Sequence, residues 1–104
     1  MTIDEIIHRS KTVLQNYYGH RLQAVVVYGS VARDEACSES DIDLLVLLRQ
    51  PFNYFEETQR IIDLLYPIQL ESEHLISAKP ALVQDYERGR LQLYRTAKRE
   101  GLAV

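Results

Sequence analysis

Two short polar motifs lie between apolar segments in the first half of the chain, and their residue types are those that bind phosphates and metals. Gly29-Ser30 follows the apolar run 23–28, and Asp41-Ile42-Asp43 opens a second apolar run, 44–48. Both runs are short and rich in Val, Leu or Tyr, which is typical of buried strands. The sequence therefore predicts that the Gly-Ser pair leaves the end of one strand and that the two aspartates begin the next.

The two aspartates have the spacing of residues that share one face of a strand. Side chains of a strand alternate between its faces, so we expect Asp41 and Asp43 to point the same way and Ile42 to point into the core. Two neighbouring carboxylates repel each other unless a cation lies between them, and oxygen ligands of this kind suit Mg²⁺ or Mn²⁺. The pair predicts a divalent metal site.

The Gly29-Ser30 pair adds the features of a phosphate-binding turn. Glycine lets the backbone approach a ligand closely, Ser30 offers a hydroxyl group, and residues 31–35 are predicted to form a short helix whose first amides point at an anion. Each motif alone is common, in turns or at solvated strand ends. Together, at this spacing, they predict a site for a nucleoside triphosphate and its metal.

The central motif resembles the signature of a known family. Residues 28–33 together with 40–46 are similar to the Gly-Ser, ten residues, Asp-x-Asp pattern of the minimal nucleotidyltransferases of the DNA polymerase beta superfamily. Weaker similarity at 93–95 and 98–101 extends the resemblance over nearly the whole chain. It implies the nucleotidyltransferase fold, in which a small mixed sheet is packed with helices, and ATP as the substrate.

The resemblance also assigns roles to residues of the motif. Asp41 and Asp43 would hold one or two Mg²⁺ ions, and Gly29 and Ser30 would bind the outgoing phosphates. For Arg33 two interpretations stay open, a further donor to the phosphates and a salt bridge with acidic neighbours.

Family members usually complete the site with a third carboxylate from a later strand, which acts as a metal ligand and as the base. Alternation of apolar and polar residues over 68–74 predicts such a strand. Glu71 is the preferred candidate for this catalytic role, and Glu73 is the alternative. If Gln69 occupies the family position instead, the carboxylate is missing and the site is incomplete.

Helical and strand patterns along the remaining chain indicate one α/β domain over residues 1–104. We expect a helix over 2–19, in which Thr2 and Glu5 form a capping box and Gly19 ends the helix. A second helix is expected to start at Asn53 with Glu56 and to stop at Pro67. A helical region is predicted from about 80 to 99, and a short edge strand over 102–104.

Composition restricts the classes of function. A net charge of −3 does not favour direct nucleic-acid binding, and the basic residues between 79 and 99 are read as a solvated helix face. Cys37 is the single cysteine, so an internal disulfide is excluded; it is predicted to be a bystander in a loop. His74 and His20 are predicted to be surface residues. No stretch of the sequence predicts a signal peptide or a membrane span, and we expect a cytoplasmic protein.

The resemblance implies a specific function. Minimal nucleotidyltransferases of this size are typically encoded beside a small helical HEPN RNase. There they act as antitoxins that transfer AMP from ATP to a tyrosine of the toxin, and this is the leading hypothesis. One alternative is an antitoxin that blocks the toxin by contact with little or no catalysis. Another is a small-molecule nucleotidyltransferase, against which the lack of an acceptor-binding domain argues.

Overall fold

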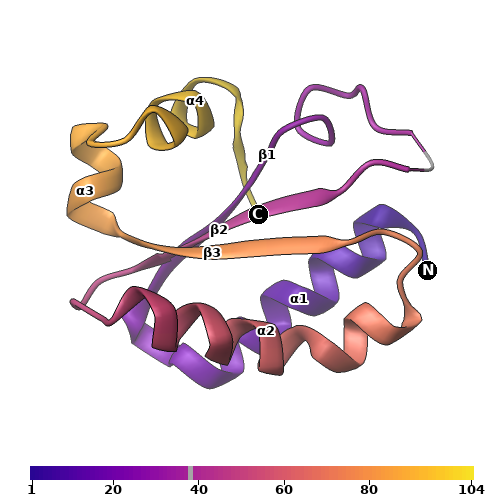
Figure 1. Ribbon diagram of the computed structural model, residues 1–104, viewed down its shortest axis with the longest axis horizontal. Helices are drawn as coiled ribbons and strands as arrows, with labels where there is room; N and C mark the ends of the chain where they lie inside the picture. Colours follow the sequence, from indigo (N-terminus) through magenta and orange to yellow (C-terminus); the bar gives the residue numbers. More distant parts are fainter. Residues whose placement is uncertain (38) are drawn as a thin grey trace.

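A mixed β-sheet with helices on both faces forms the body of the protein in the computed structural model, which describes residues 1–37 and 39–104 (Figure 1). The remaining residue, Ser38, belongs to the loop predicted around Cys37 and lies outside the described residues. The elements are α1 (Ile3–Tyr18), the 3₁₀ helix η1 (Gly19–Arg21), β1 (Leu22–Tyr28), β2 (Ile42–Leu48), α2 (Tyr54–Glu71), β3 (Ile76–Leu82), α3 (Val83–Arg88), α4 (Gln92–Glu100) and β4 (Leu102–Ala103). The strand order is β3-β2-β1-β4, with β2 and β3 parallel and the other pairs antiparallel. This confirms the predicted nucleotidyltransferase type of α/β fold.

The two faces of the sheet carry separate apolar cores. Helices α1 and α2 cover one face, and α3 and α4 lie on the other (Figure 1). Val25 and Leu44 belong to the core under α1 and α2, whereas Val26 and Leu45 belong to the core under α4. Strands buried on both faces read as continuous apolar runs, which is why β1 and β2 could be recognised from the sequence.

Several local predictions are confirmed. Helix α1 begins with a capping box between Thr2 and Glu5, and Gly19, with a φ of 58°, is its C-cap. The side chain of Asn53 accepts a hydrogen bond from the amide of Glu56 and caps α2. The short edge strand after α4 is present as β4. In the described residues, no helix has the length and apolar character that crossing a membrane requires.

The predicted strand over residues 68–74 is wrong. Helix α2 continues past Pro67, which is exposed, and ends at Glu71. Ile68 is buried against the core, so packing of this last turn offsets the backbone hydrogen bond that the proline removes. The third strand of the sheet is β3, which comes after the predicted segment.

Pro80 does not open a helix, because it lies within β3 at the edge of the sheet. The amide of Ile76 donates to the side-chain oxygen of Gln69 at 2.7 Å. The backbone N–H of Ile76 therefore points away from β2. Backbone groups alternate along a strand, and Pro80 therefore faces the free edge, where no ladder donor is needed.

Two helix predictions also need correction. Residues 31–35 form a hydrogen-bonded turn and no helix, with the amide of Arg33 donating to the carbonyl of Gly29. The helical region predicted over 80–99 is divided into α3 and α4 by Gly89, whose φ of 65° and ψ of 38° end α3 in the left-handed region.

Candidate active site

The two sequence motifs meet at one end of the sheet. Strands β1 and β2 are antiparallel neighbours, and Tyr28, the last residue of β1, pairs with Asp43. Gly29 follows with a φ of +75°, and a Cβ atom at this position would lie 2.4 Å from Oδ2 of Asp43. Only glycine fits both the backbone conformation and the carboxylate beside it. The Gly-Ser turn and the Asp-x-Asp segment are thus one packed unit.

Asp41 and Asp43 flank a fully buried residue, as the sequence predicted. Ile42 is 0% exposed and packs in the core under α1 and α2, whereas Asp43 is half-buried and Asp41 is exposed just before β2 begins. Burial raises the pKa of the Asp43 carboxyl, the charge of Asp41 raises it further, and the charges of Lys79 and Arg33 lower it. The repulsion between the two carboxylates is the unfavourable energy that a bound cation would relieve.

The carboxylates are suitable ligands for Mg²⁺, but the protein supplies few of them. In the part of the chain that the structure describes, no group of three or more His, Cys, Asp or Glu side chains is close enough to hold a metal. Mg²⁺ commonly takes one or two carboxylates and completes its shell with phosphate oxygens and water. Asp41 and Asp43 fit that pattern, with the nucleotide as a source of further ligands.

The turn after β1 contains backbone amides both with and without a backbone hydrogen-bond partner in the described residues. The amides of Arg33, Asp34 and Glu35 donate within the turn. In the described residues, the amides of residues 30–32 donate to no other backbone group. Successive free amides beside a glycine form a concave site for an anion. Phosphate binding by Gly29 and Ser30, which stays a prediction, is compatible with this geometry.

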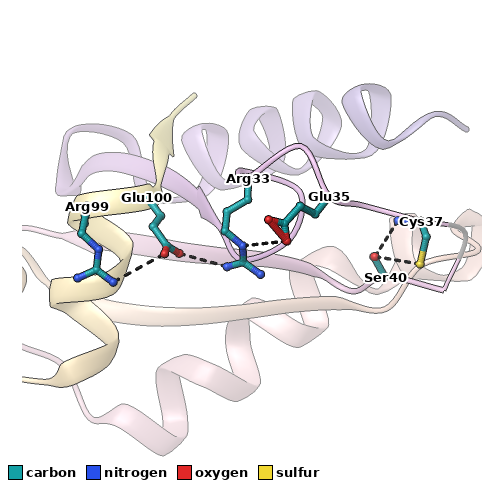
Figure 2. Close-up of polar contacts among 6 residues, drawn as sticks. All are labelled: Arg33, Glu35, Cys37, Ser40, Arg99 and Glu100. Atoms are coloured by element: carbon teal, nitrogen blue, oxygen red, sulfur yellow. Dashed lines mark hydrogen bonds and ion pairs between the residues drawn. The ribbon is translucent and has the colours of Figure 1, made fainter.

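Arg33 joins the turn to the C-terminal end of α4 (Figure 2). Its guanidinium lies 3.4 Å from Glu35 and 3.1 Å from Glu100. Glu100 also lies 3.7 Å from Arg99. Exposed ion pairs of this kind contribute little to stability, because water and salt screen them. The salt-bridge interpretation of Arg33 is therefore present in the structure, although with Glu100 as an additional partner that sequence reasoning missed, and a contact of Arg33 with phosphates stays a prediction.

Glu71 is not on a strand beside Asp43. It is the last residue of α2, exposed, and its carboxylate lies 3.1 Å from Arg9 of α1. Glu73 is also exposed and lies in the segment before β3. The assignment of Glu71 as the third carboxylate depended on a strand over 68–74, and that strand does not exist.

The strand that does lie beside Asp43 carries two residues that sequence reasoning did not place at the site. Ser77 pairs with Asp43, and Lys79 follows two residues later. Ile76 and Ala78 pack on the core under α1 and α2, so Ser77 and Lys79 face the same side of the sheet as Asp43. The alternation of apolar and polar residues over 76–79 was the sequence signal for this strand. It was missed because Pro80 argues against a strand at this position.

His74 holds the start of the Asp-x-Asp segment. Its Nδ1 lies 2.8 Å from the carbonyl oxygen of Ser40, the residue before Asp41. Gln69 fixes His74 in turn, because its amide nitrogen donates to the His74 carbonyl at 2.9 Å. The side chain of Ser40 accepts from the amide of Cys37 at 2.9 Å (Figure 2). His74 is thus a structural support of the acidic segment, beyond the surface role predicted for it.

Together, the mixed sheet, the turn after β1 and the paired carboxylates form a single α/β domain with a candidate site for phosphate and metal. The chain belongs to the nucleotidyltransferase domain family, whose sequence profile matches residues 8–102. It is 34% identical over 77 residues to a protein of Methanocaldococcus jannaschii named putative protein adenylyltransferase, an alignment that covers 74% of this chain and 77% of that one.

Solved structures confirm the fold. Spectinomycin adenyltransferase AAD(9) from Enterococcus faecialis, crystallised with ATP and spectinomycin, matches with a TM-score of 0.75 at 17% identity. The match covers 99% of this chain and 56% of AAD(9), so the chain spans little more than half of that protein. A structure described as a putative minimal nucleotidyltransferase has a TM-score of 0.64 at 27% identity, with 100% of this chain and 97% of that one covered.

Proposed function

We propose that this chain is a protein adenylyltransferase that transfers AMP from ATP, with Mg²⁺, to a tyrosine of a HEPN-domain RNase and thereby acts as its antitoxin. The observation that carries the proposal is the contact between Gly29 and Asp43, because it joins a phosphate-binding turn to a metal-binding carboxylate pair. The relative named as a protein adenylyltransferase supports a protein as acceptor. The HEPN partner rests on the family resemblance of the sequence motif.

The reaction is a displacement at the α-phosphorus of ATP. The acceptor oxygen forms a bond to the α-phosphorus, the bond from that phosphorus to the bridging oxygen breaks, pyrophosphate leaves, and the acceptor proton passes to solvent. The turn at Gly29-Ser30 binds the leaving phosphates through its amides and hydroxyl group. Asp41 and Asp43 would hold the divalent cation, and a bound cation would supply positive charge to offset the charge that develops on the phosphates.

The contact-inhibitor alternative has one observation in its favour. Strand β3, the neighbour of Asp43, contains no acidic residue over Ile76–Leu82, so in the part of the chain that the structure describes this strand offers no carboxylate to take the acceptor proton. A site of this kind suits an acceptor that ionises easily, and a phenol with an ordinary pKa of about 10 does so far more readily than a serine hydroxyl. The lack of a carboxylate base on β3 therefore favours a tyrosine over a serine as the acceptor, and it is compatible with catalysis.

The experiment is the intact mass of a purified HEPN RNase before and after incubation with this protein, ATP and Mg²⁺. We expect an added mass of AMP and lasting loss of RNase activity, at ratios of this protein well below one per toxin. Asp41→Asn and Asp43→Asn should each abolish transfer, because each removes a metal ligand. Asp63→Asn is the matched control, since Asp63 is an exposed carboxylate of α2 on the opposite side of the sheet from Asp43.

A contact inhibitor gives a different pattern of results. The toxin would gain no mass, would recover full activity when this protein is stripped away, and would still be protected by the Asp41 and Asp43 variants at stoichiometric amounts. Transfer to spectinomycin or a similar small molecule, with none to the RNase, would instead favour the remaining alternative.

A further inference from the structure

The face of the sheet that carries Asp43 also carries a cation. Lys79 is half-buried in β3, two residues beyond Ser77, which pairs with Asp43. The neighbours of Lys79 in β3 fix its direction, because Ala78 packs in the core under α1 and α2 and Pro80 is fully buried. Half-burial of a lysine is typical of a stem that lies along the sheet and an ammonium group that reaches solvent, and the register leaves Lys79 two residues from the position that pairs with Asp43.

Lys79 has no carboxylate partner of its own. In the described residues it takes part in no ion pair within 4 Å, whereas Arg33, the other cation that acts on Asp43, is paired with Glu35 and Glu100. Lys79 lies on the strand next to Asp43 and on the same face of the sheet, so its long side chain can reach the site, and in the described residues no other side chain forms an ion pair with it.

The supply of protein ligands on this face suits one divalent cation, which Asp41 and Asp43 would hold. A second cation would need ligands from β3, and that strand offers a hydroxyl from Ser77 and a positive charge from Lys79. Oxygen anions bind Mg²⁺, whereas an ammonium group repels it.

The position of Lys79 relative to the phosphate-binding turn indicates what its ammonium group contacts. Gly29 touches Asp43 from β1, whereas Lys79 approaches from β3 on the other side of β2. If the leaving phosphates lie on the β1 side and the metal lies at the carboxylates, the incoming acceptor lies on the β3 side. A cation there favours the ionised form of an acceptor hydroxyl.

We infer that Lys79 is a catalytic residue that takes the place of a second metal ion, so that the site binds one divalent cation and the ammonium group stabilises the acceptor oxygen as an anion. This inference rests on the proposed function and specifies the chemistry of its acceptor side. The proton still passes from the acceptor to solvent, and no additional reactant is needed.

The test counts bound metal, and it does not depend on turnover. The probe is Mn²⁺ with an ATP analogue that has a methylene group between the α- and β-phosphorus atoms, followed by the electron paramagnetic resonance signal of free Mn²⁺. We expect one Mn²⁺ per wild-type protein and two in Lys79→Asp, which supplies a new carboxylate on the same face. Lys98→Asp is the matched control with the same change of charge at an exposed position of α4, and it should still bind one.

Lys79→Met is a second variant, which tests the inference even if Lys79→Asp does not fold. We expect its affinity for the analogue to change less than about threefold and its transfer to the RNase to fall about 10²-fold, as for loss of a group that stabilises an anion. Its pH profile of transfer should also shift upward, whereas Lys98→Met should match the wild type.

Two results would overturn the inference alone, namely two Mn²⁺ ions bound to the wild type, or transfer by Lys79→Met at the wild-type rate and pH profile. Failure of the proposed function looks different. In that case the wild type does not bind the analogue with Mn²⁺, or Asp43→Asn binds as much Mn²⁺ as the wild type, and the inference falls with it.

Discussion

Gly29→Ala tests the contact that joins the two motifs. Two separate energies oppose the substitution. An alanine at a φ of +75° is strained by about 1–2 kcal/mol. Its Cβ would also lie 2.4 Å from Oδ2 and 3.3 Å from Cγ of Asp43, so the carboxylate must turn away, and a side chain forced about 30° from its rotamer costs about 1 kcal/mol. We expect the free energy of unfolding to fall by about 2–3 kcal/mol.

A double-mutant cycle with Asp43→Ala separates the two energies. Without Oδ2 and Cγ, the nearest remaining atom of residue 43 to the new methyl group is Cβ at 3.6 Å, an ordinary contact. In the Asp43→Ala background, Gly29→Ala should lower the free energy of unfolding only by the energy of backbone strain. The coupling energy between the two substitutions is then about 1 kcal/mol. Gly89→Ala is a comparison for backbone strain at a φ of +65°, although its Cβ would lie 2.9 Å from Cγ of Arg95, so that exposed side chain has to shift.

The assay is urea unfolding followed by far-ultraviolet circular dichroism, for the four proteins of the cycle and the Gly89 control. An equal loss from Gly29→Ala in the presence and absence of the Asp43 carboxylate would refute the reasoning, since it would mean that glycine is required for its backbone conformation alone.

Three further predictions concern the supports of the site. Because the fold raises the pKa of Asp43, its ionised form destabilises the folded state, so Asp43→Asn should raise the melting temperature near neutral pH. This gain should shrink as the pH falls toward the ordinary aspartate pKa of 3.8, and a gain that is independent of pH in thermal unfolding would contradict the assignment. His74→Ala should weaken Mn²⁺ binding several-fold with little loss of secondary structure, since it frees the segment before Asp41; unchanged binding in a Mn²⁺ titration would contradict this. Arg33→Gln and Glu100→Gln should each change the free energy of unfolding only slightly, because their ion pair is exposed. If Arg33 also binds phosphates, only Arg33→Gln should weaken ATP binding in calorimetry, and equal affinities would leave the salt bridge as its whole role.

The parts of the fold that could be predicted from the sequence are those that local chemistry decides. The capping box at Thr2, the cap at Asn53 and the apolar strands β1 and β2 each depend on residues close together in the chain. The candidate metal ligands Asp41 and Asp43 belong to the same class, because alternation within one strand places them.

The third strand could not be predicted, because tertiary packing overrides its local signals. A proline is expected to stop a helix and to be absent from a strand, yet Pro67 lies inside α2 and Pro80 inside β3. Burial of Ile68 stabilises the helix beyond Pro67. Pro80 is tolerated in β3 because its backbone faces the free edge of the sheet. Neither the burial of Ile68 nor the free edge beside Pro80 can be recognised from the sequence. As a result, the third strand was predicted over 68–74, and Glu71 was wrongly assigned to the site.

The spacing between Gly29-Ser30 and Asp41-Ile42-Asp43 follows from the antiparallel pairing of β1 and β2, and β3 takes no part in it. Antiparallel neighbours place the end of β1 beside the start of β2, so the segment 29–41 must return to the same end of the sheet, and its two ends necessarily meet. The close approach of Gly29 to Asp43 then fixes the phosphate turn against the metal ligands. Strand β3 joins from the other side of β2 and shares no part of this loop. Its residues can therefore change without disturbing the contact between Gly29 and Asp43. We propose that a serine and a lysine there change the number of bound cations and the nature of the acceptor, while the transfer chemistry at the α-phosphorus is retained.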